Sequence, residues 1–597
     1  FILILSLFFI DDVCAETYIN NVNNIQNNFD DFPQFFDLRR LGLVSPIKNQ
    51  KSYGTCWSFA SLGAIETSLI PKNPNNDFSE WHLAYFNYYG DNTVDLAPFE
   101  EFYNSGGYPS FYTSTLSQWI GPVLENELPY ETPKEEIDLA LKQKSEYHLQ
   151  KSYFLNGYAN YRLSPSEEIL NFTINEIKSL LISKNAVVAN YYHTDENYNN
   201  ETFSYYIKTK QNPNHAILIV GWDDNFKKEN FKSQPQNNGA WLIKNSWGDK
   251  WGENGYFWIS YEDASLTDTN VLFVENNDNY DNIYLHDNMG FNTSISADNI
   301  NRKSSYMANV FTAENNEDLS AVSFYTTDRK ASYEIYIYTN LKNQSNPTSG
   351  FLAHKQSGYE DFAGYHTINL DKKVEIEKNS KFSIVVKLTN PTNLYPIAIE
   401  ACVILGERTQ NIDLGRISKN KINSNTNYFE SFISSNGLNW TDTKNLKIMR
   451  TSEEKEYFDQ DISIYTGNVS IKAFTNSIDK IEFSNKNEYV SKNELINLSC
   501  ENSNEIYFTL DGTEPNLNSP KFNDSILISK DTLIKASAFI NGELKSVNSK
   551  HYKLLQSKLS SLTINKENID LHDLNEKNEL YFHLKTLEDS ITLFPIG

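Results

Sequence analysis

The sequence predicts a multidomain protein in which an α+β domain is followed by all-β sandwich domains. The chain has 597 residues, several times the roughly 100 to 200 residues of one domain. Eight of its nine tryptophans lie between Trp57 and Trp258, and this marks a change of composition near residues 262–275. Helical spacing fades there, and short alternating runs typical of sandwich strands take over.

The chain opens on an apolar run, Phe1 to Ile10, which is followed by the small residue Ala15. This pattern predicts a signal peptide over residues 1–15 and a short leader over residues 16–31, with a buried N-terminal strand as the alternative. The run lacks an initiator Met, so we expect further residues before it. No later segment reaches the roughly 18 uninterrupted apolar residues of a membrane span. We therefore expect a secreted, extracellular or cell-surface protein without a transmembrane segment.

The α+β domain is expected over residues 32–265. Cys56 to Leu69 has apolar residues at helical spacing, and Ala216 to Val220 is a short buried-strand run that ends at Gly221. The all-β part should contain three pieces: a sandwich over residues 275–475, a second all-β unit over residues 478–554, and a strand-like start over residues 557–597 that is too short for a full sandwich.

Charge and cysteine content exclude several classes of function. The 77 acidic residues against 52 Lys and Arg give a net charge of −25, which repels phosphate backbones, so no nucleic-acid partner is expected. The four cysteines are too few and too scattered for a disulfide scaffold or a four-thiolate zinc site. Residues 276–279 with Asp281 offer oxygen ligands of the kind that calcium takes, but such runs are more often solvated loops, and no metal is assigned.

One group of residues indicates nucleophilic catalysis. Cys56 stands at the first turn of the predicted helix, after a loop that contains Gly54. Because a helix N-terminus stabilises anions, we expect the pKa of this thiol to fall. His215 leads directly into the apolar strand, whose fixed backbone could hold an imidazole still, and Asn245 and Trp247 follow some thirty residues later. The amide oxygen could accept the imidazole N–H, and the indole could cover that bond from water.

Three blocks strongly resemble, in the same order, the signature blocks of papain-like cysteine proteases: residues 49–60, 215–222 and 241–256. Residues 32–39 also look like the mature start of that family, so the resemblance covers about residues 32–262. Any one of these motif residues alone would more often be an ordinary core or turn residue, but three blocks in order are far more specific. The resemblance implies a fold with a helical subdomain and a β-barrel-like subdomain, and thiol-dependent peptide hydrolysis without a cofactor.

The resemblance also assigns roles to particular residues. Cys56 would be the nucleophile, and His215 the general base and acid that holds Cys56 as a thiolate. Asn245 would orient His215, Gln50 would supply the oxyanion-hole side chain, and Trp247 would support the site. Six positions match substrate-binding residues of the family: Gly106, Gly107, Tyr108 and Pro109 as a substrate-aligning strand, with Pro213 and Asn214 beside the same pocket.

The chain departs from the family pattern in two places. Tyr53 stands where plant and animal relatives carry a disulfide-bonded cysteine. Cys56 is the only cysteine in the sequence of residues 32–262. The catalytic domain should therefore have no disulfide. A polar stretch, Asp223 to Asn238, looks like an inserted surface loop.

The β part carries weaker resemblances. Residues 275–475 look like the lectin-like sandwich that follows the protease in some bacterial secreted and surface-layer cysteine proteases. Residues 478–554 resemble the small immunoglobulin-like module at the C-terminus of chitobiases, and residues 557–597 resemble the start of a cadherin-like sandwich. These modules imply location rather than chemistry, and they are candidates for contact with the cell surface or with glycans.

The implied function is that of a secreted cysteine endopeptidase, which hydrolyses peptide bonds in extracellular or cell-surface proteins through a thioester acyl-enzyme. The alternative is a surface adhesin or scaffold whose papain-like domain is catalytically silent. All four catalytic residues are present, which favours the enzyme, since silent relatives usually lose at least one. Because these residues all precede residue 262, we also expect residues 32–270 to be active alone.

Overall fold

The structure is a computed structural model in which the chain forms two compact units, residues 32–477 and the residues from 478 onward. The predicted signal peptide and leader lie outside the described residues. Within the described part of the chain, no helix is long and apolar enough to cross a membrane. The structure describes residues 32–89, 102–104, 106–155, 167–288, 290–291, 293–297, 300, 302–405, 426–446, 462–478, 480–487, 489–500, 503, 505–554, 562–564, 567–569 and 591–592.

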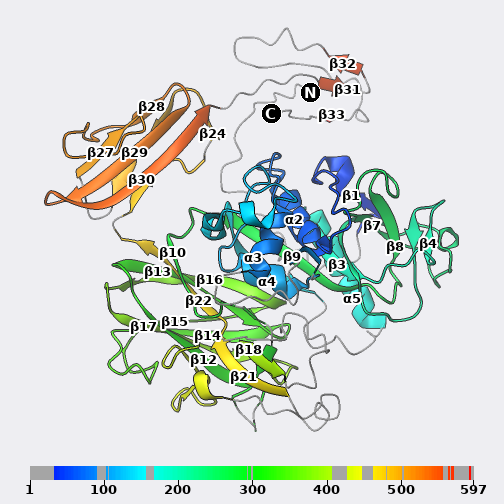
Figure 1. The fold of residues 1–597 in the computed structure, drawn as a ribbon, viewed down its shortest axis with the longest axis horizontal. Helices are drawn as coiled ribbons and strands as arrows, with labels where there is room; N and C mark the ends of the chain where they lie inside the picture. The colour runs from blue at the N-terminus through cyan, green and yellow to red at the C-terminus, as the bar shows by residue number, and fades with distance from the viewer. Residues whose placement is uncertain are drawn as a thin grey trace. The chain divides into compact units, whose positions relative to one another are not determined.

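The first part of the 32–477 unit contains its main helices (Figure 1). The helix predicted to begin at Cys56 is confirmed, and it is buried along almost its whole length. The next helix is capped by Ser79, whose Oγ accepts the His82 N–H at 3.0 Å. The helix bounds are α2 (Cys56–Leu69), α3 (Glu80–Tyr88), α4 (Pro109–Leu116) and α5 (Glu167–Ile182).

The helices pack on a large sheet that contains thirteen strands in the order β10-β22-β13-β16-β2-β9-β3-β6-β7-β8-β5-β4, with β1 also paired to β6. Neighbouring strands are antiparallel except for β5 and β8. The predicted run at residues 216–220 lies in β6, which is buried from end to end apart from its last residue. The strands of the first part are β1 (Phe35–Asp37), β2 (Tyr147–Phe154), β3 (Val187–Tyr191), β4 (Tyr198–Asn199), β5 (Ser204–Tyr205), β6 (His215–Asp223), β7 (Ala240–Lys244), β8 (Tyr256–Ser260) and β9 (Thr267–Asn276).

The second part of this unit is a β-sandwich, as the alternating runs predict. Its core residues alternate along the strands, for example Ile335 and Ile337 on β14, which face Ile384 and Val386 on β17. A six-stranded sheet, β15-β14-β17-β12-β19-β20, and a three-stranded sheet, β11-β18-β21, lie beside strands of the large sheet. The strands are β10 (Asn282–Tyr284), β11 (Thr293–Ile295), β12 (Ser304–Thr312), β13 (Glu317–Thr326), β14 (Ala331–Thr339), β15 (Phe351–Glu360), β16 (Ala363–Ile376), β17 (Lys381–Thr389), β18 (Ile397–Leu405), β19 (Ser431–Ser434), β20 (Thr441–Asp442), β21 (Ile462–Val469) and β22 (Ile471–Ser477).

One strand joins the two parts. β2 pairs with β9 on one side and with β16 of the sandwich on the other, in a register that sets Phe154 opposite Ala363. Arg329, from the sandwich, donates to Leu155 O at 2.9 Å. Its guanidinium also donates to both carboxylate oxygens of Glu176 on α5. The two parts therefore share both a sheet and a set of buried contacts.

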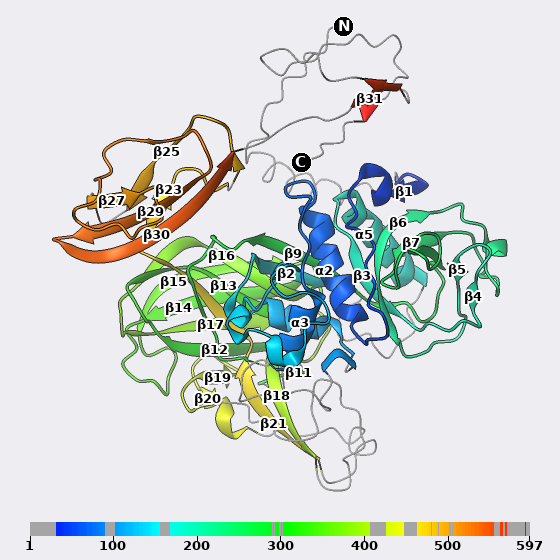
Figure 2. The same ribbon diagram turned by 45° about the horizontal axis from the view of Figure 1, so that its top comes forward.

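The residues from 478 onward form small sheets (Figure 2), in which neighbouring described strands are antiparallel except for β24 and β30. A four-stranded sheet, β24-β30-β29-β27, covers a core that includes Ile481, Ile534 and Tyr552. The short strands after residue 560 are too few to test the cadherin-like prediction. The strands are β23 (Ile481–Phe483), β24 (Tyr489–Val490), β25 (Glu494–Ile496), β26 (Leu498–Cys500), β27 (Glu505–Thr509), β28 (Ile526–Ile528), β29 (Thr532–Ile540), β30 (Glu543–Leu554), β31 (Leu562–Ile564), β32 (Glu567–Ile569) and β33 (Ile591–Thr592).

The shared sheet changes the expectation that residues 32–270 suffice alone. That piece ends inside β9 and leaves the β16 side of β2 without a partner. We now expect residues 32–276 to melt about 10 °C or more below residues 32–477, since each 1 kcal/mol lost lowers Tm by roughly 2–4 °C in a domain of this size. Calorimetry of the two pieces measures the difference, and equal melting temperatures would show that the junction adds no stability.

Candidate active site

Cys56 is the first residue of α2, and the turn before it is held from outside the helix. The Gly54 N–H donates to Tyr103 O at 2.7 Å, and a side chain at position 54 would press on the Asn104 backbone at 3.4 Å. Glycine therefore lets this loop lie close to its neighbour. The thiol faces the strand that carries the catalytic histidine candidate, because the backbone of Ala216 hydrogen-bonds it.

The predicted fall in the pKa of this thiol is wrong. Burial raises the pKa of Cys56, and it outweighs the hydrogen bonds from the backbones of Ala216, Trp57 and Cys56 itself, which act to lower it. The sequence shows that Cys56 begins a helix, but not how deeply its thiol is buried. Burial likewise lowers the pKa of His215 to about 4, although Asn245 opposes that shift.

His215, Asn245 and Trp247 come together as the spacing predicted. His215 begins β6, and its Nε2 lies 2.8 Å from Asn245 Oδ1. Both residues are almost fully buried. The Trp247 ring stacks on the imidazole with centroids 4.5 Å apart and planes at 25°. Because an amide oxygen only accepts, this bond places a hydrogen on Nε2 and leaves Nδ1 as the basic nitrogen of the neutral ring.

Gln50 lies beside this group because its loop runs against the Asn245 segment. The Gln50 N–H donates to Ser246 O at 2.8 Å. Both ends of the carboxamide are fixed: Nε2 donates to Tyr53 O at 2.7 Å, and Ser246 Oγ donates to Oε1 at 2.6 Å. Ser246 is thus a contact of Gln50 that the sequence analysis did not single out, although it stands next to Asn245.

Of the six positions proposed to bind substrate, residues 106–109 do not form the strand predicted for them, and the binding role of all six stays a prediction. Residues 106–108 form no strand, and Pro109 is a buried first residue of α4, where its ring favours a helix start. Gly107 packs against Trp57, whose ring a Cβ would meet at 2.4 Å. Gly106 has a φ of 73° and its carbonyl accepts from Tyr88 Oη. These contacts fix the loop against the helical part of the domain.

Two of those six positions are exposed. Tyr108 is 46% exposed and Asn214 is exposed, while Gly106, Gly107 and Pro213 are half-buried. The Asn214 side chain is hydrogen-bonded to the backbone of His193: Oδ1 accepts the His193 N–H at 2.7 Å, and Nδ2 donates to His193 O at 3.1 Å. Asn214 thus holds a neighbouring strand end in place.

The departures from the family pattern have structural substitutes. Tyr53 packs edge-on against the rings of Trp81 and Tyr103, with centroids 5.3 and 5.1 Å away. Cys56 forms no disulfide. The inserted stretch at residues 223–238 is anchored by Phe226, whose ring stacks on Trp258.

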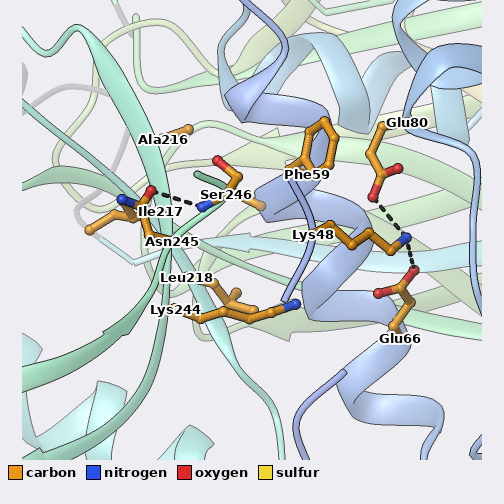
Figure 3. Close-up of a pocket in the computed structure, with 11 residues that line it drawn as sticks. Lys48, Phe59, Glu66, Glu80, Ala216, Ile217, Leu218, Lys244, Asn245 and Ser246 are labelled. Atoms are coloured by element: carbon orange, nitrogen blue, oxygen red, sulfur yellow. Dashed lines mark hydrogen bonds and ion pairs between the residues drawn. The ribbon is translucent and has the colours of Figure 1, made fainter. Parts of the chain in front are cut away.

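A buried group of charges lies next to the site (Figure 3). Lys48 Nζ is 2.8 Å from Glu66 Oε1 and 2.9 Å from Glu80 Oε1. Burial works against the Lys48 charge, but Glu80 and Glu66 outweigh it and raise its pKa. Burial lowers the pKa of Lys244 to about 8. Together with Asn245 these residues line a small pocket between α2 and the β6–β7 pair.

The residues considered for calcium point in different directions. Asn277 Nδ2 donates to Ser145 O, and Asn279 Oδ1 lies 2.7 Å from His148 Nδ1. Asp281 accepts the Ser477 N–H at 2.9 Å. Among the described residues, no group of three or more His, Cys, Asp or Glu could hold a metal ion. These side chains instead join loop to strand.

Family models match three stretches of the chain. Residues 32–274 match the papain family cysteine protease, residues 283–475 match a lectin like domain, and residues 496–552 match a domain described as Fn3 associated. The papain-like and lectin-like resemblances are thereby confirmed. The chitobiase-like resemblance is not confirmed and stays a prediction.

Solved structures show the same pairing of domains. The clostridial cysteine protease Cwp84 after propeptide cleavage is 27% identical with a TM-score of 0.57, and the match covers 74% of this chain and 99% of that one. The cysteine protease and lectin-like domains of Cwp84, a surface layer associated protein of Clostridium difficile, are 25% identical with a TM-score of 0.56, over 77% of this chain and 97% of that one.

Curated relatives match only the first part of the chain. A cysteine protease of Blomia tropicalis is 26% identical over 254 residues, which are 41% of this chain and 66% of the relative. Cathepsin J of Rattus norvegicus is 30% identical over 232 residues, which are 38% of this chain and 60% of the relative. The chain thus spans about two thirds or less of the length of these relatives.

The pKa shifts predict how the thiol ionises. The lowered pKa of His215, about 4, and the raised pKa of Cys56 mean that the pair keeps one proton from about pH 4 to above the usual thiol range. In that range the shifts leave the proton on sulfur and the imidazole neutral, so alkylation of Cys56 by iodoacetamide should rise in a single step, above roughly pH 8.5. Mass spectrometry of the Cys56 peptide follows the rate. A rise already near pH 4 would mean that the proton lies on His215 and that Cys56 is a thiolate at neutral pH.

Proposed function

We propose that the papain-family cysteine protease domain, which in this chain precedes a lectin-like domain, is an active endopeptidase that hydrolyses extracellular or cell-surface proteins. One observation carries the proposal: the 2.8 Å hydrogen bond between His215 Nε2 and Asn245 Oδ1 beneath the Trp247 ring. This bond orients the imidazole so that Nδ1 can take a proton. The rings around the bond exclude water from it.

In the proposed reaction, Cys56 Sγ gives its proton to His215 Nδ1 and attacks the peptide carbonyl carbon. The resulting oxyanion is met by the Cys56 N–H and by the Gln50 Nε2 hydrogen that is not donated to Tyr53 O. His215 then passes the proton to the leaving amine as the C–N bond breaks. Water hydrolyses the thioester with His215 as its base and frees the thiol.

Two features support a site of action at the cell surface. The lectin-like match at residues 283–475, in the same unit as the protease domain, supports a surface or glycan contact. The structurally similar Cwp84 is described as surface layer associated. We propose the same setting for this chain, with protein or peptide substrates.

A thiol-reactive epoxide separates the enzyme from a silent scaffold. An active site should label at Cys56 in a peptide map, while denatured protein should not label there preferentially. Labelling spread evenly over the cysteines, or none at Cys56, would favour the silent adhesin.

We expect Cys56→Ala to abolish peptide hydrolysis and leave the fold intact, because α2 needs no thiol for its packing. Cleavage of a fluorogenic peptide and circular dichroism test the two halves of this statement. Cys500→Ala is the matched control, since it removes a cysteine from the other unit. Activity retained by Cys56→Ala would exclude the mechanism.

Gln50→Ala should keep residual turnover, because the Cys56 N–H remains as a donor. Loss of one oxyanion donor typically lowers kcat by roughly 100- to 1000-fold. Ser246→Ala should cause a smaller loss, since it frees only one end of the Gln50 carboxamide. Steady-state kinetics measure both losses. An unchanged kcat in Gln50→Ala would mean that Gln50 does not donate to the oxyanion.

Cleavage should favour an apolar residue two positions before the cut bond. Tyr108, Pro213 and Asn214 carry no charge that could compensate a buried charged side chain there. A buried apolar side chain gains roughly 1.5 to 3 kcal/mol, enough for about ten- to a hundredfold selectivity. A positional-scanning peptide library measures the preference. Equal cleavage with Arg or Glu at that position would contradict the pocket.

A further inference from the structure

A second histidine, His193, lies close to the catalytic group. It follows the end of β3, and its side chain is only 12% exposed. Its ring meets Trp247 edge-on, with centroids 4.8 Å apart and planes at 81°. Trp247 in turn stacks on His215. One indole therefore separates two imidazoles.

The backbone around His193 is fixed to the backbone around His215. The carboxamide of Asn214 holds both the N–H and the carbonyl of His193, at 2.7 and 3.1 Å. The Asn214 N–H donates to Tyr191 O at 3.1 Å, and Tyr191 is paired with His215 in the β3–β6 ladder. The two histidines consequently keep their relative positions.

Both nitrogens of the His193 ring have partners. Nδ1 lies 2.8 Å from Tyr191 Oη, and Nε2 lies 3.4 Å from Asp195 Oδ1. The opposite side of the ring stacks on Tyr205, with centroids 5.6 Å apart and planes at 26°. Protonation of the ring would add a positive charge that, among the described residues, Asp195 on the same loop balances through a fully exposed carboxylate.

We propose that His193 is a positioning residue for the reaction at Cys56 and His215. It supports Trp247 over the His215–Asn245 bond, and its own proton disfavours a second proton on the Cys56–His215 pair. This role rests on the proposed function, which it deepens by adding a second titrating group to the site.

The electrostatic part follows from the charges present. Burial lowers the pKa of His193, and the hydrogen bond and charge of Asp195 oppose that shift. Burial also lowers the pKa of His215, and the charge of His193 adds to the effect. A positive neighbour disfavours the extra proton whether it is added to imidazole or thiolate. The groups that face His193 or its partners are Asp195, Lys232, Tyr191, Tyr198, Tyr205, His215 and Cys56.

The test compares the pKa of His215, followed by NMR of its imidazole, in the full chain and in two variants. His193→Phe keeps a ring against Trp247 and removes the charge, and His193→Gln keeps a polar partner for Tyr191. We expect the pKa of His215 to rise by about half a unit to 1.5 units, because one neighbouring unit charge in a partly screened site is removed. The alkylation step of Cys56 above roughly pH 8.5 should stay in place, because His193 is neutral there. His551→Phe, an exposed histidine in the other unit, is the control and should follow the wild-type profile.

The outcomes separate this inference from the proposed function. A pKa of His215 that stays at the wild-type value in both folded variants, checked by circular dichroism, overturns the role of His193. A shifted pKa of His215 without any peptide hydrolysis by the wild type supports that role and defeats the proposed function. A uniform loss of rate with no shift would mean that His193 only packs, and would also overturn the proposal.

Discussion

The antiparallel pairing of β6 with β3 and β7 determines most of the site. His215 begins β6, β7 ends immediately before Asn245, and β3 ends two residues before His193. In antiparallel pairs the start of one strand meets the ends of its neighbours. The proposed catalytic residues His215 and Asn245 therefore lie at the same edge of the sheet as His193. Helix α2, which begins at Cys56, packs against β6, the strand that begins at His215.

Buried charges fix the elements on the other side of the cleft. Lys48 precedes Gln50 by two residues, Glu66 lies on α2 beyond Cys56, and Glu80 begins α3. Buried ions are costly unless well paired, so removing Lys48 would leave Glu66 and Glu80 without the ammonium group that both now accept from. Lys244 adds a link to the strand before Asn245 through Ser45. The arrangement joins segments that carry three of the four proposed catalytic residues.

Sequence reasoning located the motif residues and the strand-rich second part, because motif spacing and alternation are local properties. It failed where long-range packing decides the outcome. Burial of Cys56 reversed the shift expected from its helix start. Pro109 began a helix where a strand was predicted. The partner of β2 lies about two hundred residues away on β16, and nothing in residues 147–154 indicates that both edges of that strand are occupied.

The position of β2 between two domains has a consequence for how such proteins diversify. Both edges of β2 are hydrogen-bonded, one to β9 and one to β16, so a one-residue slip would break its register with both neighbours and turn its side chains to the opposite faces of the sheet. Exchange of either domain alone would leave one edge of β2 without the strand that now pairs with it.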